Sequence, residues 1–168
     1  MRTLYLCRHA KSSWADPGQD DHDRPLNERG LHDAPMMARL FKERNEPVDR
    51  IVTSTALRAL TTARSFARTL QLDAARFAVE PRLYHASTAT INHAVNALPG
   101  NAQRAMLFGH NPGFTEVLEH FTGEGVLNMP TCGLARIDFL VDDWALVGRH
   151  MGTLVWFDHP KAHYTPGQ

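Results

Sequence analysis

Four side chains in this sequence have the types and positions to do chemistry on a tetrahedral anion. An arginine guanidinium carries permanently charged, planar donors that match phosphate oxygens. A neutral imidazole can attack phosphorus and form a phosphoimidazole that water later hydrolyses. The set suits a tetrahedral dianion better than a metal ion or an acyl substrate. The four side chains are Arg8, His9, Arg58 and His110.

Each of these groups follows a short apolar run that predicts a buried strand, over residues 3–7, 48–53 and 105–108. Helix-like segments separate the runs, and this alternation predicts a mainly parallel sheet. The carboxyl ends of such strands meet along one edge, which is where α/β proteins bind ligands. We therefore expect the four side chains to converge.

The pattern along the chain predicts one α/β domain, a three-layer sandwich whose mostly parallel central sheet has helices on both faces. Residues 134–140 and 153–157 predict a C-terminal hairpin at one edge of the sheet. We expect the domain to span residues 1–158 and residues 159–168 to form a poorly ordered tail. A further short strand is expected near residues 77–80, and helices are expected near residues 28–44, 55–70, 88–98 and 112–121.

The first of these helices has Asn27 as its expected N-cap. Pro35 indicates that this helix starts late or kinks, and its expected inner face consists of Leu31, Met37, Leu40 and Phe41. Ser54 is the expected cap of the second helix.

Asn111 and Pro112 predict a helix start beside His110, with Asn111 as N-cap and Pro112 as the first helical residue. Backbone N–H groups at such a start bind anions. Residues 10–26 form a polar, turn-rich loop, and a loop of this length inside a compact domain is usually functional.

Composition limits the partners. With 18 basic and 18 acidic residues, no net field favours nucleic acid or a membrane surface. No apolar run approaches the ~18 residues needed to span a bilayer, and two cysteines without a disulfide framework suit a reducing compartment. We expect a cytoplasmic protein. His159 and His163 lack a third ligand nearby, so we expect no metal.

Several residues also have plain structural interpretations. A single histidine at a strand end is more often a satisfied polar group than a nucleophile, and Arg58 alone would be a solvated helix residue. Lys11 either contacts substrate or is a solvated cation, and Trp14 either lines the pocket mouth or covers the core. Cys7 lacks the Cys-x5-Arg pattern of a nucleophilic cysteine. The joint occurrence of the four side chains favours the functional interpretation.

The motifs resemble those of a known family. Leu-Cys-Arg-His-Ala-Lys-Ser-Ser-Trp at residues 6–14 is similar to the Arg-His signature of the histidine phosphatase superfamily, the phosphoglycerate-mutase-like group. Ser-Thr-Ala-Leu-Arg-Ala at 54–59 and Gly-His-Asn-Pro-Gly at 109–113 resemble its second and third segments. Together with residues 23–30, 127–131 and Trp144, they are most similar to the SixA-type phosphohistidine phosphatases.

This resemblance implies that His9 accepts the phosphoryl group, that Arg8, Arg58 and His110 hold it with the backbone of Asn111 beside them, and that no cofactor is needed. Many relatives carry a glutamate proton donor after the third strand. Here His85 stands near that position and Glu80 lies five residues earlier. An imidazole leaving group needs less acid help than an alkoxide, which gains ~10²–10⁴-fold from general acid catalysis.

The expected function is therefore a phosphatase that works through a phosphohistidine on His9, with a phosphorylated phosphotransfer protein in signal transduction as the favoured substrate. A small-molecule phosphatase or mutase is the first alternative, although the short chain has few insertions from which to build a sugar-recognising cap. A catalytically weak phosphate-binding module is the second alternative. The sequence does not indicate the oligomeric state.

Overall fold

The computed structural model describes residues 1–167, and Gln168 lies outside the described residues. One mixed sheet of six strands forms the centre, in the order β3-β2-β4-β1-β5-β6. β1, β2, β3 and β4 pair in parallel, whereas β5 and β6 are antiparallel. The strands are β1 (Arg2–Arg8), β2 (Arg50–Thr53), β3 (Phe77–Val79), β4 (Arg104–Gly109), β5 (Leu134–Phe139) and β6 (Gly152–Asp158).

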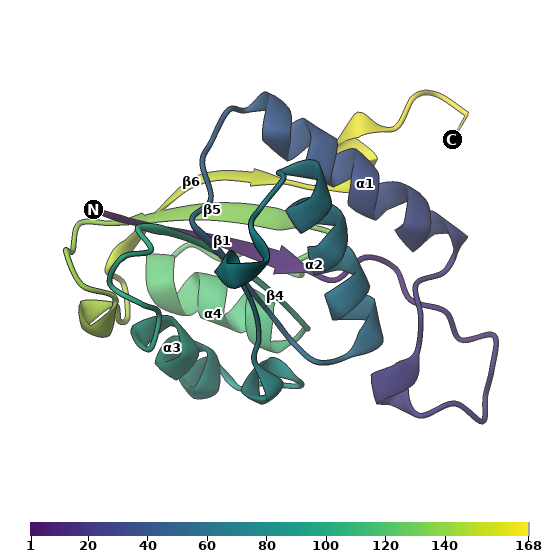
Figure 1. Cartoon of the computed structure of the whole chain (residues 1–168), viewed down its shortest axis with the longest axis horizontal. Helices are drawn as coiled ribbons and strands as arrows, with labels where there is room; N and C mark the ends of the chain where they lie inside the picture. The colour runs from purple at the N-terminus through teal and green to yellow at the C-terminus, as the bar shows by residue number, and fades with distance from the viewer. Residues whose placement is uncertain (168) are drawn as a thin grey trace.

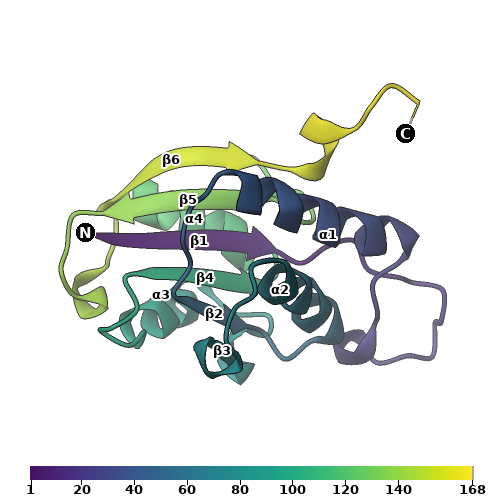
Figure 2. The same cartoon turned by 45° about the horizontal axis from the view of Figure 1, so that its top comes forward.

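Helices cover both faces of this sheet (Figures 1 and 2). The helices are α1 (Glu28–Glu43), α2 (Leu57–Thr69), α3 (Thr88–Asn96) and α4 (Gly113–Thr122). Five short 3₁₀ turns lie at Asp21–Asp23, Ala74–Arg76, Pro81–Leu83, Trp144–Leu146 and Pro160–His163. The expected three-layer sandwich, parallel core and C-terminal edge hairpin are confirmed.

The alternation of side chains along β1 shows how the layers are built. Leu4 and Leu6 pack into the core under α3 and α4, whereas Tyr5 and Cys7 pack into the core under α1 and α2. Successive strand residues point to opposite faces, so a strand buried on both sides reads as a continuous apolar run. β1 is therefore a central strand whose carboxyl end is held from both layers.

Details of the α1 interpretation need correction. Asn27 does cap α1, accepting a hydrogen bond from the Gly30 amide at 2.9 Å. Pro35 lies inside the helix without delaying its start at Glu28. Leu31 is 59% exposed. It lies in the first turn of α1, although Ala34 and Ala38, three and seven residues further along, are buried.

The start of α2 differs from the expected cap. α2 begins at Leu57 with Ala56 at the N-cap position. The hydroxyl of Ser54 accepts from the Ala56 amide but also bonds to His110 across the sheet edge. This long-range bond places Ser54 in the strand-to-helix turn.

The start of α4 also differs. Pro112 occupies the N-cap position and α4 begins at Gly113. The side chain of Asn111 accepts from the amide and the hydroxyl of Thr115. The amide of Phe114 donates to the carbonyl of His110, so the first turn is largely satisfied from within the chain.

The segment after β6 is more ordered than expected up to residue 164. Pro160 is buried, and the hydroxyl of Tyr164 donates to both oxygens of the buried Asp33 at 2.8 Å. His163 bonds to Asp158 at 2.7 Å. The segment therefore packs against α1. The domain boundary at residue 158 stays a prediction.

Candidate active site

Three neighbouring strands bring the expected residues to one edge of the sheet. β2, β4 and β1 are adjacent and parallel, and their carboxyl ends lie on the side of the long loop after β1 (Figure 2). The pairing continues beyond the strands: the His9 amide donates to the Gly109 carbonyl and the Ser54 amide to the Phe108 carbonyl, both at 3.0 Å. His9 and His110 therefore lie side by side, with ring centroids 5.1 Å apart.

The backbone around His9 fixes which ring nitrogen is free. Nδ1 lies 2.7 Å from the carbonyl oxygen of Ala10, and because a carbonyl only accepts, Nδ1 must carry the proton. The Ala10 amide is held in turn by the hydroxyl of Thr62 in α2. Burial, together with the charges of Arg58 and Arg8, lowers the pKa of His9 to about 3. His9 is thus neutral at pH 7, with the lone pair on Nε2.

His110 is oriented by Ser54. Its Nε2 lies 2.8 Å from the Ser54 hydroxyl, which already accepts from the Ala56 amide. Since the described residues offer that hydroxyl no other acceptor, it donates to Nε2, and Nδ1 carries the ring proton. Burial, followed by the neighbouring His9 and Arg58, lowers the pKa of His110 to about 2. The group beside His9 is therefore a neutral donor.

Arg8 and Arg58 each use only part of their guanidinium group. Nη1 of Arg8 donates to the Met129 carbonyl at 2.9 Å. Arg58, 2% exposed, donates through Nη2 to the carboxylate of Asp21 at 2.9 Å and through Nη1 to its carbonyl at 2.6 Å. Burial, and then the charge of Arg58, lowers the pKa of Arg8. The two positive charges repel each other in this buried region, and an anion bound between them would relieve the repulsion.

Unpartnered donors identify where that anion would bind. Among the described residues, four buried side-chain nitrogens have no hydrogen-bond partner, and three of them are Nε of Arg8, Nε of Arg58 and Nδ1 of His110. A buried donor without a partner costs about 1–3 kcal/mol. Three of them beside one neutral imidazole indicate a site that a multivalent acceptor such as a phosphoryl group would satisfy.

Asp21 is a member of this cluster that the sequence interpretation missed. Its Oδ2 accepts from Arg58, from the hydroxyl of Tyr84 at 2.6 Å and from Nε2 of His85 at 3.0 Å. Although burial acts to raise it, these hydrogen bonds hold the pKa of Asp21 below its usual value. Asp21 is therefore the carboxylate that pairs with the buried Arg58 at the start of α2. The only signal in the sequence was the length of the polar loop that contains Asp21.

The two candidate proton donors lie in different surroundings. His85 faces the cluster, since its ring centroid is 5.5 Å from that of His110. Its φ of 48° is in the left-handed region, where residues of functional sites are enriched. Gly113 lets this loop approach, because a Cβ there would lie 2.2 Å from the Ala86 carbonyl oxygen. Glu80 instead forms a two-pronged ion pair with Arg82, which lowers its pKa.

The remaining candidates lie at the edge of the cluster or outside it. The side chain of Asn111 is committed to Thr115, Asn128 and the Met129 carbonyl; a role for its backbone stays a proposal. Trp14 is 72% exposed and stacks on the guanidinium of Arg24 at 3.5 Å, so it does not cover the core. Lys11 is half-buried, and its backbone carbonyl accepts from the amide of Asn27 at 3.0 Å; a substrate contact by its side chain stays a prediction.

Within residues 1–167, no group of three or more His, Cys, Asp or Glu side chains is placed to hold a metal ion. In the same range, no helix has the length and apolar character required to cross a membrane.

Comparison with known proteins agrees with this geometry. The model of the histidine phosphatase superfamily (branch 1) matches residues 4–87. An uncharacterized protein of Mycobacterium tuberculosis (strain H37Rv) is 33% identical over 165 residues, covering 92% of this chain and 99% of that protein. A SixA protein of Agrobacterium tumefaciens, provisionally described as a phosphohistidine phosphatase, is 31% identical with a TM-score of 0.79, covering 95% of this chain and 98% of that one.

A structure of the protein histidine phosphatase SixA complexed with tungstate has a TM-score of 0.82, covers 96% of this chain and 99% of that one, and is 21% identical, which supports the fold alone. The fold and the sequence matches define a phosphatase of the α/β sandwich type. The chain belongs to the histidine phosphatase superfamily, and within it the chain is SixA-like.

Proposed function

We propose that this chain is a protein phosphohistidine phosphatase that carries the phosphoryl group covalently on Nε2 of His9. One observation supports this proposal above all others: three buried, unpartnered donors surround a histidine whose free nitrogen carries a lone pair. The similar SixA proteins are described as histidine phosphatases, which supports the choice of substrate.

In the first step, Nε2 of His9 attacks phosphorus and the bond between phosphorus and the leaving group breaks. His9 needs no base, because its Nδ1 proton is already held by the Ala10 carbonyl and its ring is neutral. Arg8, Arg58 and Nδ1 of His110 donate to the phosphoryl oxygens as charge develops on them. Fixed donors of this kind are typically worth about 2.7–4 kcal/mol each in the transition state.

The leaving-group side favours a nitrogen–phosphorus bond. Glu80 is ionised and paired with Arg82, so it is a poor acid, and the nearest candidate is His85, held by Asp21. A phosphorylated imidazole that carries a proton on its second nitrogen leaves as neutral imidazole without an acid from the enzyme. An alkyl phosphate expels an alkoxide and depends on one.

In the second step, water attacks phosphorus on His9, the bond between phosphorus and Nε2 breaks, and inorganic phosphate leaves. Because His9 leaves as a neutral imidazole with its proton on Nδ1, both protons of the attacking water stay on the product, which leaves as dihydrogen phosphate. We also propose that the protein acts in the cytoplasm on a phosphotransfer protein of a signalling pathway. Its two buried, unpaired cysteines are compatible with a reducing compartment.

Replacement of the nucleophile tests this proposal. A phosphotransfer protein labelled with ³²P on histidine should yield an acid-labile, alkali-stable phosphoenzyme with the unmodified protein, and neither label nor turnover with His9→Ala. His93→Ala, an exposed histidine of α3, is the matched control and should behave as the unmodified protein. Full activity of His9→Ala would refute the covalent mechanism. Faster hydrolysis of sugar phosphates than of the phosphoprotein, compared by kcat/KM, would favour the small-molecule alternative.

A further inference from the structure

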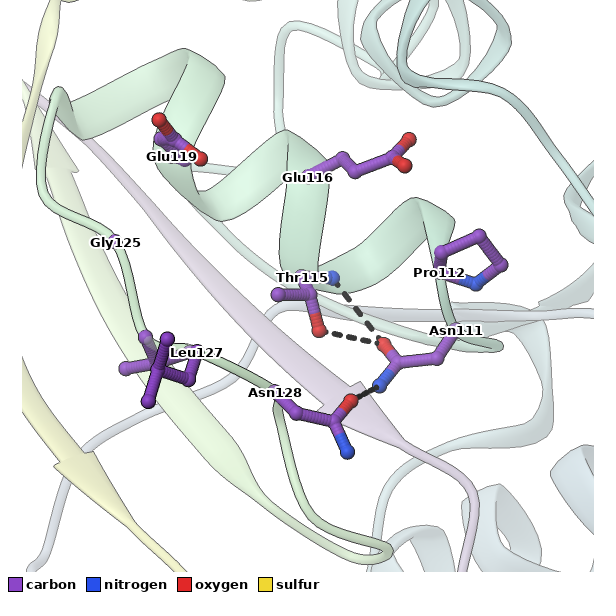
Figure 3. A pocket seen from close by; sticks show the side chains of 9 residues that line it. Asn111, Pro112, Thr115, Glu116, Glu119, Gly125, Leu127 and Asn128 are labelled. Carbon is purple, nitrogen blue, oxygen red and sulfur yellow. Dashed lines mark hydrogen bonds between the residues drawn. The ribbon is translucent and has the colours of Figure 1, made fainter.

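A groove lies beside the candidate phosphate site, between α4 and the segment 125–128 that follows it (Figure 3). Its volume is about 660 Å³. Of the residues discussed above as candidates for the phosphate site, Asn111 lines it, whereas Arg8, His9, Arg58 and His110 do not. The groove is lined by Asn111, Pro112, Thr115, Glu116, Glu119, Gly125, Val126, Leu127 and Asn128.

One wall of this groove is acidic. Pro112, Glu116 and Glu119 lie at positions i, i+4 and i+7, so the two glutamates share one face of α4. Both are exposed, and neither forms an ion pair with any residue from 1 to 167. Basic and acidic residues balance over the whole chain, so the negative charge of this wall is local. It favours a partner with basic side chains.

The opposite wall is apolar at its tip. Leu127 is fully exposed and Val126 is half-buried behind it. Figure 3 shows Leu127 and Asn128 on the segment that faces the α4 residues. A partner that contacts both walls would therefore need a cationic and an apolar side chain close together.

The groove begins at the rim of the phosphate site. The Met129 carbonyl accepts from Nη1 of Arg8 at 2.9 Å and from Nδ2 of Asn111 at 3.0 Å. Asn111 also donates to Asn128 at 2.6 Å and directly follows His110. One carbonyl thus joins a guanidinium of the phosphate site to the wall of the groove, so a substrate held by Arg8 has its flanking chain next to this opening.

We propose that this groove docks the polypeptide next to the phosphohistidine of the substrate protein, with a Lys or Arg against Glu116 and Glu119 and an apolar side chain on Leu127. The proposal rests on the proposed function and names the feature that the enzyme recognises. From Pro112 to Glu119, α4 rises about 10 Å. That length equals about three residues of extended chain or about two turns of helix in the substrate.

The test compares a protein substrate with a small one. Phosphorylated phosphotransfer protein reaches the groove, whereas free phosphohistidine fills only the phosphate site. Exposed ion pairs are worth 0.2–1 kcal/mol, which corresponds to about 1.4- to 5-fold in affinity for each glutamate. We expect the double variant Glu116→Gln/Glu119→Gln to raise KM for the phosphoprotein about 2- to 25-fold and to reduce its salt dependence. Its kcat, and its kcat/KM for free phosphohistidine, should stay unchanged.

Glu43→Gln, at the end of α1, is the matched control and should leave the KM and kcat for both substrates unchanged. Leu127→Ala should raise KM for the phosphoprotein alone. An unchanged KM for the phosphoprotein in the double variant would overturn the docking proposal and leave the proposed function standing. An equal loss of kcat/KM on the phosphoprotein and on free phosphohistidine would do the same. An unmodified protein inactive on both phosphohistidine substrates would overturn the two proposals together.

Discussion

The two buried imidazoles should make the folded protein lose stability in weak acid. Histidine has a pKa near 6.5 in an unfolded chain, whereas burial lowers the pKa of His9 to about 3 and that of His110 to about 2. Below pH 6.5 the unfolded state therefore binds protons that the folded state refuses. The free energy of unfolding is fully preserved above pH 6.5 and falls as the pH drops towards the folded pKa values.

The loss in the free energy of unfolding follows from how far the pH lies below 6.5. One pKa unit corresponds to about 1.36 kcal/mol, so at pH 4.5, two units below 6.5, each histidine removes about 2.7 kcal/mol. The pair removes about 5 kcal/mol, a large part of the 5–15 kcal/mol by which most domains are stable. Asp21, whose pKa is also lowered, acts only below about pH 4. The interval from pH 6 to 4.5 thus separates the histidines from Asp21. Burial also lowers the pKa of His120, but His120 is present in the unmodified protein and in both site variants, so it does not affect the difference between their slopes.

Urea unfolding followed by tryptophan fluorescence measures this slope. Between pH 6 and 4.5, each of His9→Asn and His110→Asn should reduce the slope by about 1.4 kcal/mol per pH unit, whatever its stability at pH 7.5. His93→Asn, an exposed histidine of α3, should leave the slope unchanged. A slope equal to that of the unmodified protein in both site variants would refute the inference that these imidazoles are neutral in the folded state.

Three further substitutions test individual contacts. Arg58→Ala should lower kcat at least tenfold while the protein stays folded by circular dichroism, because Arg58 is proposed to donate to the phosphoryl oxygens; a folded variant with an unchanged kcat would contradict this role. Ser54→Ala should lower kcat about tenfold and stability by about 1–3 kcal/mol, because Nε2 of His110 loses its donor, and Ser54→Thr should restore part of both. His85→Asn should change turnover of phosphohistidine protein less than threefold but slow an alkyl phosphate at least tenfold, and equal losses on both would argue against a leaving-group role.

The sequence predicted which residues meet at the edge of the sheet. Strands in parallel order end together, so Arg8, His9 and His110 could be placed side by side from the apolar runs that precede them. The edge hairpin was predictable from the two β-prone runs at residues 134–140 and 153–157. Leu31 was misplaced because its exposure depends on what covers the first turn of α1, which the helical periodicity does not show.

The parts that could not be predicted depend on contacts distant in sequence. Asp21 lies in a loop without periodicity, and it reaches Arg58 and His85 only in the folded chain. Ser54 carries a local signal for a helix cap, and its bond to His110 outweighs that signal. The Met129 carbonyl, which orients Arg8, is a backbone atom and leaves no mark in the residue types.

The charges of the site indicate which partner controls the pH dependence of binding. Arg8 and Arg58 carry permanent charge, Asp21 is ionised, and both imidazoles are neutral throughout the physiological range. Under the proposed function, the attraction for a phosphoryl group comes from guanidinium groups, so the proposed binding groups do not titrate between pH 5 and 8. Any change in affinity for inorganic phosphate over that interval should therefore follow the second ionisation of phosphate itself. A histidine that titrated near pH 6.5 would add a second transition to the same binding curve.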